Sequence, residues 1–78
     1  MAAATRRQRV HREVRRACIQ EMRQMRKEGL TKTLSREEFR DEAFERVACR
    51  DDLPEDIDWE SLLTMIFEFI MALLALFF

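Results

Sequence analysis

The sequence predicts an all-α protein with three helices. Among its 78 residues there are one Gly, one Pro and no Tyr, a composition that disfavours turns and strands. Apolar residues recur at spacings of three and four instead of alternating. Two helix-start signals divide the chain into helices over about residues 4–28, 36–50 and 59–78, of which the last is strongly hydrophobic. A chain of this length has room for one small unit, residues 1–78.

The first helix, within residues 1–28, is predicted to be basic and amphipathic. Gly29 follows it at the position where a left-handed residue ends a helix, with Leu30 as the apolar residue that folds back. The apolar residues of this helix share one face and form its predicted buried stripe: Val10, Val14, Ala17, Cys18, Met22 and Met25.

The second helix, within residues 35–50, has the clearest local start signal in the sequence. Ser35 and Glu38 have the spacing of a capping box, and Leu34 and Phe39 that of a hydrophobic staple. Its predicted inner face consists of Phe39, Ala43, Phe44, Val47 and Ala48, and Glu42 and Arg46 form an i,i+4 pair. An acidic connector, residues 51–58, follows it. Asp58 in this connector is the expected N-cap of the last helix.

The last helix, residues 59–78, carries the strongest functional signal. Fifteen of its last seventeen residues are apolar. Burying them is worth on the order of 20 to 40 kcal/mol gross, an upper bound that still exceeds the net stability of a typical domain. The two preceding helices can cover only one side of it. We therefore expect a partner or lipid to pack against Leu62, Leu63, Ile66, Phe67, Phe69, Ile70, Leu73, Leu74, Phe77 and Phe78.

Small and polar residues form a narrow stripe along the same helix. Small residues at helical spacing let two helices approach closely, and a polar residue among them can form a hydrogen bond to the second helix. The stripe is predicted to be a helix–helix seam or the inner face of a ring, with Glu68 as its polar contact; a solvent-exposed face is the alternative. Its residues are Ser61, Thr64, Glu68, Ala72 and Ala75.

Lipid and protein are both possible surroundings for residues 61–78. Eighteen residues reach the lower limit for crossing a bilayer, and Trp59 lies where an interfacial aromatic residue is expected. Glu68 lies in the middle of the segment, where an ionised carboxylate is unfavourable in lipid. Protein packing is therefore the preferred prediction, and a membrane is the alternative.

The charge is unevenly distributed along the chain. Residues 1–27 hold nine Lys or Arg against two Glu, whereas residues 28–78 hold five basic against thirteen acidic side chains. The basic helix is predicted to bind an acidic protein surface or nucleic-acid phosphates, with a solvated face as the alternative. No aromatic residue lies between its arginines to stack on single-stranded bases. The residues predicted to bind an anionic partner are Arg6, Arg7, Arg9, Arg12, Arg15, Arg16, Arg23 and Arg26.

Catalysis is not expected from this sequence. It has one His, one Gly and no phosphate-binding loop, and therefore no cofactor or small-molecule substrate is predicted. A metal site from His11, Cys18 and Cys49 is disfavoured by their spacing, and both cysteines are expected to be reduced, small core residues. The N-terminal residues lack the apolar region of a secretory signal. An intracellular, reducing compartment or a larger particle is therefore the expected location, not secretion.

Together these observations predict a non-enzymatic structural or assembly protein. Its C-terminal helix packs in an oligomer or larger assembly, and its basic helix contacts an acidic surface or nucleic acid; a component of a viral particle would suit this pattern. One alternative is a membrane-associated protein anchored by the last helix, including an oligomeric pore. Another is a small nucleic-acid-binding regulator that dimerises through its tail.

Overall fold

The computed structural model describes residues 6–78, with side chains from Arg7 onward. This part of the chain forms four helices and no strand: α1 (Arg6–Lys27), α2 (Leu30–Thr33), α3 (Arg36–Ala48) and α4 (Trp59–Leu74). The all-α prediction is therefore confirmed. The expected helix start near residue 4 lies outside the described residues.

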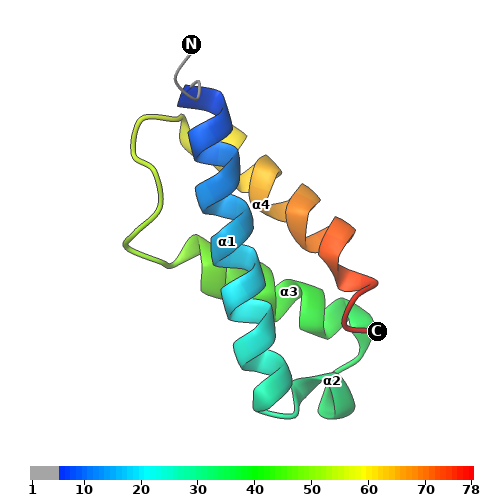
Figure 1. The fold of residues 1–78 in the computed structure, drawn as a ribbon. Coiled ribbons are helices and arrows are strands. Elements are labelled where there is room, and N and C mark those ends of the chain that lie inside the picture. Colours follow the sequence, from blue (N-terminus) through cyan, green and yellow to red (C-terminus); the bar gives the residue numbers. More distant parts are fainter. Residues whose placement is uncertain (1–5) are drawn as a thin grey trace.

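The three long helices pack around one apolar core. Each of α1, α3 and α4 contacts the other two, and α1 runs along the length of the molecule (Figure 1). The connector between α3 and α4 loops outward and returns beside the first turns of α1 (Figure 1). There Arg9 pairs with Asp56 at 3.2 Å. This path places the start of α4 near the start of α1.

The α1–α3 connection contains a one-turn helix that the sequence analysis missed. Gly29 adopts a left-handed φ of 81°, as expected for a residue that ends a helix. The chain then turns once more as α2, with the Leu34 N–H donating to the Leu30 carbonyl at 2.9 Å. Leu30 and Leu34 both pack against the core. Their burial explains why the chain makes this extra turn instead of an open loop.

The start of α3 is the capping box that the sequence predicts. The Ser35 hydroxyl accepts from the Glu38 N–H at 3.1 Å, and the Glu38 carboxylate accepts from the Ser35 N–H at 2.8 Å. The helix ends at Ala48, two residues earlier than expected. Beyond this end, Arg50 donates to Glu21 on α1 at 2.8 Å and to Asp52 at 2.7 Å. These bonds hold residue 50 outside the helix.

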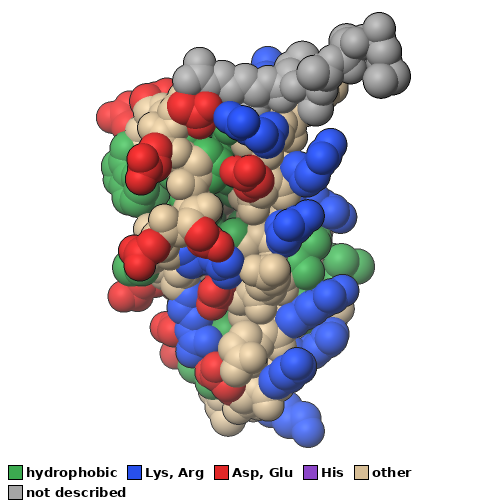
Figure 2. Space-filling model, turned by 60° about the vertical axis from the view of Figure 1, so that its left-hand side comes forward, with side chains coloured by type: hydrophobic (Ala, Val, Ile, Leu, Met, Phe, Trp, Pro, Cys, Tyr) green, Lys and Arg blue, Asp and Glu red, His purple; other side chains and the backbone are tan. Residues whose placement is uncertain are grey.

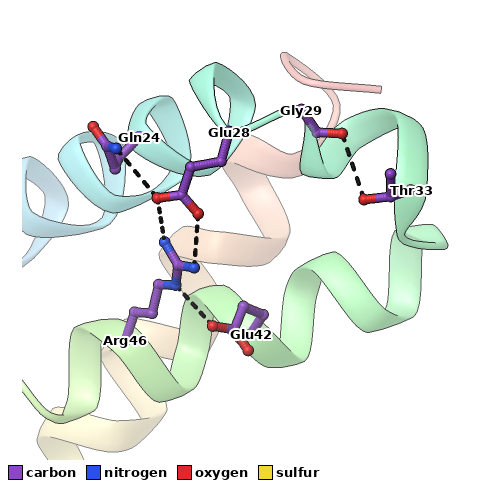
Figure 3. A network of polar contacts seen from close by, with 6 residues as sticks. All are labelled: Gln24, Glu28, Gly29, Thr33, Glu42 and Arg46. Atoms are coloured by element: carbon purple, nitrogen blue, oxygen red, sulfur yellow. Dashed lines mark hydrogen bonds and ion pairs between the residues drawn. The ribbon is translucent and has the colours of Figure 1, made fainter.

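A polar network joins the far end of α1 to α3 (Figure 3). Arg46 donates to both carboxylate oxygens of Glu28, at 3.2 and 3.0 Å, and to Glu42 at 2.7 Å. Gln24 donates to the same Glu28 carboxylate at 3.2 Å. The expected Glu42–Arg46 pair is therefore present, and Arg46 also links two helices.

Helix α4 starts as predicted but ends earlier. The Asp58 side chain accepts from the Ser61 N–H at 3.0 Å. The helix stops at Leu74 instead of residue 78, and a tight turn follows, in which the Phe78 N–H donates to the Leu74 carbonyl at 3.1 Å. This turn places the Phe77 and Phe78 rings 6.0 and 5.2 Å from the Phe39 ring. Burial of these two rings against α3 thus competes with continuation of α4.

The core is apolar, with no buried polar or charged side chain in the described part of the chain. All six residues of the predicted α1 stripe are buried, as are Phe39, Ala43 and Val47 on α3. The two cysteines differ: Cys18 is fully buried and donates to the Ile66 carbonyl at 3.9 Å. Cys49 is exposed at the end of α3, so the prediction that it is a core residue is wrong.

Candidate docking surface

Helix α4 buries one face in the core of its own chain. Its inner positions follow helical spacing and are at most 6% exposed. They include half of the residues that the sequence assigned to a partner or to lipid: Leu62, Ile66, Ile70, Leu73 and Leu74. In the folded chain, α1 and α3 cover this row.

The other half of that predicted set lies at the edge of the core or outside it. Leu63, Phe69 and Phe77 are half-buried. Phe67 is 43% exposed and Phe78 47% exposed. Phe67 is in edge contact with Phe44, at 6.2 Å between ring centroids. It therefore anchors one edge of α4 to α3 while part of its ring remains open.

The outward face of the second half of α4 and of the following turn is apolar. Leu76 is 71% exposed and Met71 is 42% exposed, although both are large hydrophobic side chains. Together with neighbouring exposed residues they form a set that we name the docking surface: Phe67, Met71, Ala72, Ala75, Leu76 and Phe78.

Sequence reasoning missed Met71 and Leu76 as surface residues. The polar residues Thr64 and Glu68 mark the outward side of the helix. Met71, Ala72 and Ala75 continue that side at helical spacing. The positions of these residues around the helix axis could have identified the exposed apolar residues, whereas side-chain size alone could not.

The predicted seam lies on this outward side. Ser61, Thr64, Glu68, Ala72 and Ala75 are all exposed. The Thr64 hydroxyl donates to the Glu60 carbonyl at 3.0 Å. No side chain of the described residues forms an ion pair with Glu68. Within one copy the stripe therefore faces away from the core, and no helix of residues 6–78 covers it.

Arginines flank the docking surface on both sides. On the α1 side, a groove beside Leu76 is lined by Arg15, Arg23 and Arg26 together with Ile19. The Arg26 guanidinium lies 5.0 Å from the centre of the Phe77 ring. On the α3 side, the Arg40 guanidinium lies 5.9 Å from the Phe67 ring. Cation–π contact with these rings leaves the arginines at the rim of the apolar surface.

The outer face of α1 carries the predicted anionic-partner residues. Seven of them are exposed, and Arg9 pairs with Asp56, whereas the side chain of Arg6 lies outside the described part. Figure 2 shows a column of basic side chains down one edge of the molecule and acidic side chains gathered on the other side. Of these seven arginines, six form no ion pair with another described residue: Arg7, Arg12, Arg15, Arg16, Arg23 and Arg26.

The remaining candidate groups are dispersed. An open groove between the first turns of α1 and α4 is lined by His11, Ser61 and Glu68 among others, and the His11 ring makes edge contact with Phe69 at 5.8 Å. No three His, Cys, Asp or Glu side chains cluster as metal ligands in residues 7–78. Burial raises the pKa of the Cys18 thiol to about 12, which holds it in the protonated, unreactive form.

None of the helices within residues 6–78 has both the length and the apolar character needed to cross a lipid bilayer.

Comparison of the chain with protein-family models, with curated proteins and with solved structures gives no match.

Proposed function

We propose that this protein is a non-enzymatic assembly module that binds a protein partner through the docking surface on α4. The observation that carries the proposal is the exposure of Phe67, Met71, Leu76 and Phe78, each between 42% and 71%; among the other large apolar side chains of the described residues only Trp59, at the start of α4, is as exposed. Small residues, Ala72 and Ala75, lie between these large side chains and allow a second helix to approach closely.

The size of the effect limits what apolar burial alone can achieve. Complete burial of a large apolar side chain contributes about 1.5 to 3 kcal/mol, so covering four half-exposed side chains contributes on the order of 4 kcal/mol. Association itself costs at least about that much in lost translational and rotational freedom. A stable complex therefore needs additional polar or ionic contacts at the rim of the docking surface, where the arginines lie.

The test is site-specific photo-crosslinking in the full chain. A photo-reactive residue at position 76 should give a discrete protein adduct, because Leu76 is the most exposed large apolar side chain of the docking surface. The same residue at position 55, in the exposed connector, should not. Met71→Lys should abolish the adduct, whereas Trp59→Lys, outside the docking surface on the same helix, should leave it unchanged. Equal adducts at positions 76 and 55, or none at 76, would refute the proposal.

A second candidate function, nucleic-acid binding, is supported by the outer face of α1. Arg12 and Arg16 are four residues apart, a rise of about 6 Å along the helix, and Arg23 follows about 10 Å further. All three are exposed and lack an ion-pair partner among the described residues. Their planar guanidinium groups are suited to contact successive phosphates.

A salt titration on duplex DNA tests this second function. The logarithm of the binding constant should fall linearly with the logarithm of the salt concentration. Arg16→Gln should reduce that slope by about 0.9 if its guanidinium contacts a phosphate. Lys32→Gln, on α2, is the matched control and should leave the slope unchanged. A slope near zero in the unmodified protein would remove this function.

A further inference from the structure

The two halves of the α4 face differ in the charged groups that they present. Its first half presents the carboxylates of Glu60 and Glu68, both exposed. Its second half is apolar and is flanked on the α1 side by Arg15 and Arg23. Neither Glu68 nor these two arginines has an ion-pair partner among residues 7–78. The carboxylate of Glu68 shares its groove with Arg7 and His11 of α1 but pairs with neither, whereas the charged groups beside the second half are all guanidinium groups.

Such a surface is complementary to a reversed copy of itself. When two α4 helices run in the same direction, Glu68 lies beside its own counterpart, which is repulsive. When they run in opposite directions and cross near Ala72, position 68 of one copy lies opposite position 76 of the other. Leu76 shares its groove with Arg15 and Arg23, so the carboxylate of Glu68 meets guanidinium groups.

We propose that the docking surface binds a second copy of this chain, as a two-fold symmetric dimer with antiparallel α4 helices. This inference rests on the proposed function and specifies its partner. Two-fold symmetry uses the same surface twice, so each Glu68–arginine contact forms two times. Ala72 and Ala75 lie at the crossing, where small side chains let the two backbones approach. The apolar side chains of both copies are covered by the same association.

Other occupants match the charge pattern less well. An anionic lipid surface or a nucleic-acid backbone would attract Arg15 and Arg23 but repel Glu60 and Glu68 on the same face. A neutral apolar partner would desolvate the carboxylate of Glu68 without adding a counter-charge to it, which is unfavourable. A reversed copy provides cations opposite the carboxylate and apolar side chains opposite the apolar half.

The experiment is a charge swap followed by light scattering and sedimentation over a range of concentrations. The unmodified protein should be a dimer that dissociates on dilution. Glu68→Arg and Arg23→Glu should each raise the dissociation constant by at least about tenfold, because each places like charges opposite one another twice. An equimolar mixture of the two variants should associate at least about threefold more tightly than either variant alone, since only one of the four charge pairs, that with Arg15 of the Arg23→Glu variant, is then repulsive.

Matched controls apply the same charge changes away from the docking surface. Glu55→Arg lies in the connector and Lys32→Glu on α2, and both original residues are exposed. Neither substitution should change the dissociation constant by more than about twofold at constant ionic strength. Circular dichroism of each variant checks that the helices remain, because all four positions are exposed and none belongs to the core.

The outcomes distinguish failure of the proposed dimer from failure of the proposed function. A monomer at every concentration, or a mixture that associates no better than its components, overturns antiparallel self-pairing. Crosslinking to another protein at position 76 would then still support the proposed function. Equal weakening by the control variants would also overturn the inference, because it would show a general charge effect. Binding to phosphatidylserine vesicles without dimerisation would assign the surface to lipid and overturn both.

Discussion

Replacing Ile66 with alanine tests which face of α4 lies inside the molecule. The Ile66 side chain is fully buried between α1 and α3, and its carbonyl accepts the Cys18 thiol. Removing a large side chain from such a site costs about 2 to 5 kcal/mol, through lost burial and the cavity that remains. The net stability of a chain of this length is only about 4 to 12 kcal/mol. The substitution should therefore remove a large part of it.

The matched substitution is Leu76→Ala near the end of the same chain. Leu76 is 71% exposed, so the same kind of truncation should change the stability of the monomer by no more than about 0.5 kcal/mol. Ile66→Val, which removes one methyl group, should cost about 0.5 to 1.5 kcal/mol. The expected order of destabilisation is therefore Ile66→Ala, then Ile66→Val, then Leu76→Ala.

Urea unfolding followed by circular dichroism at the helix band gives these free energies. It must be done at low protein concentration, because association would stabilise the folded state. In a thermal scan, a loss of about 3 kcal/mol corresponds to a fall in Tm of about 12 to 24 °C for a domain of this size. If Leu76→Ala destabilised the monomer more than Ile66→Ala, α4 would present another face to the core. The proposed docking surface would then be wrong.

Four further predictions concern the fold. Ser35→Ala should cost about 1 kcal/mol by removing the acceptor of the Glu38 N–H, measured by urea unfolding; an unchanged midpoint would contradict the capping box. The hydrogen bond from the Ser35 N–H lowers the pKa of the Glu38 carboxyl below 4.5. The contribution of this carboxylate to the stability of the fold is therefore present above the unfolded-state pKa and is lost as the pH falls through the folded-state pKa. Glu38→Gln should flatten the dependence of stability on pH below about pH 4.5, and a dependence identical to that of the unmodified protein would contradict this. Gly29→Ala should cost about 1 to 2 kcal/mol because φ is 81° there, even though no atom lies within 4 Å of the added methyl group. A thiol reagent at pH 8 should label the exposed Cys49 quickly. Cys18 is buried and the pKa of its thiol is raised to about 12, so it should be labelled only on unfolding. Two fast-reacting thiols would mean that the core is open.

The local start and stop signals were predictable because they depend on residues close in sequence. The Ser35–Glu38 capping box, the Asp58 N-cap and the left-handed Gly29 all lie where the sequence places them. The buried stripe of α1 follows from the spacing of its apolar residues, since a helix turns once every 3.6 residues. These features need no information about the rest of the chain.

The end of α4 and the exposure of its residues were not predictable in this way. In the sequence, residues 69–78 are uniformly apolar, so periodicity gives no inner or outer face there. The turn after Leu74 depends on the position of Phe39 on α3, which the Phe78 ring contacts at 5.2 Å. That contact joins residues far apart in the chain, and only the packed structure contains it.

The order of residues along the chain is enough to predict that the chain is helical, where its helices begin, and that its last segment has more apolar surface than its neighbours can cover. Local hydrogen bonds and side-chain spacing are sufficient for these properties. Only the packed chain shows which apolar residues remain outside, including Met71 and Leu76, and that Glu68 shares a groove with Arg7 and His11 of α1. Burial depends on which helix covers which side, and a linear pattern of apolar residues does not specify that.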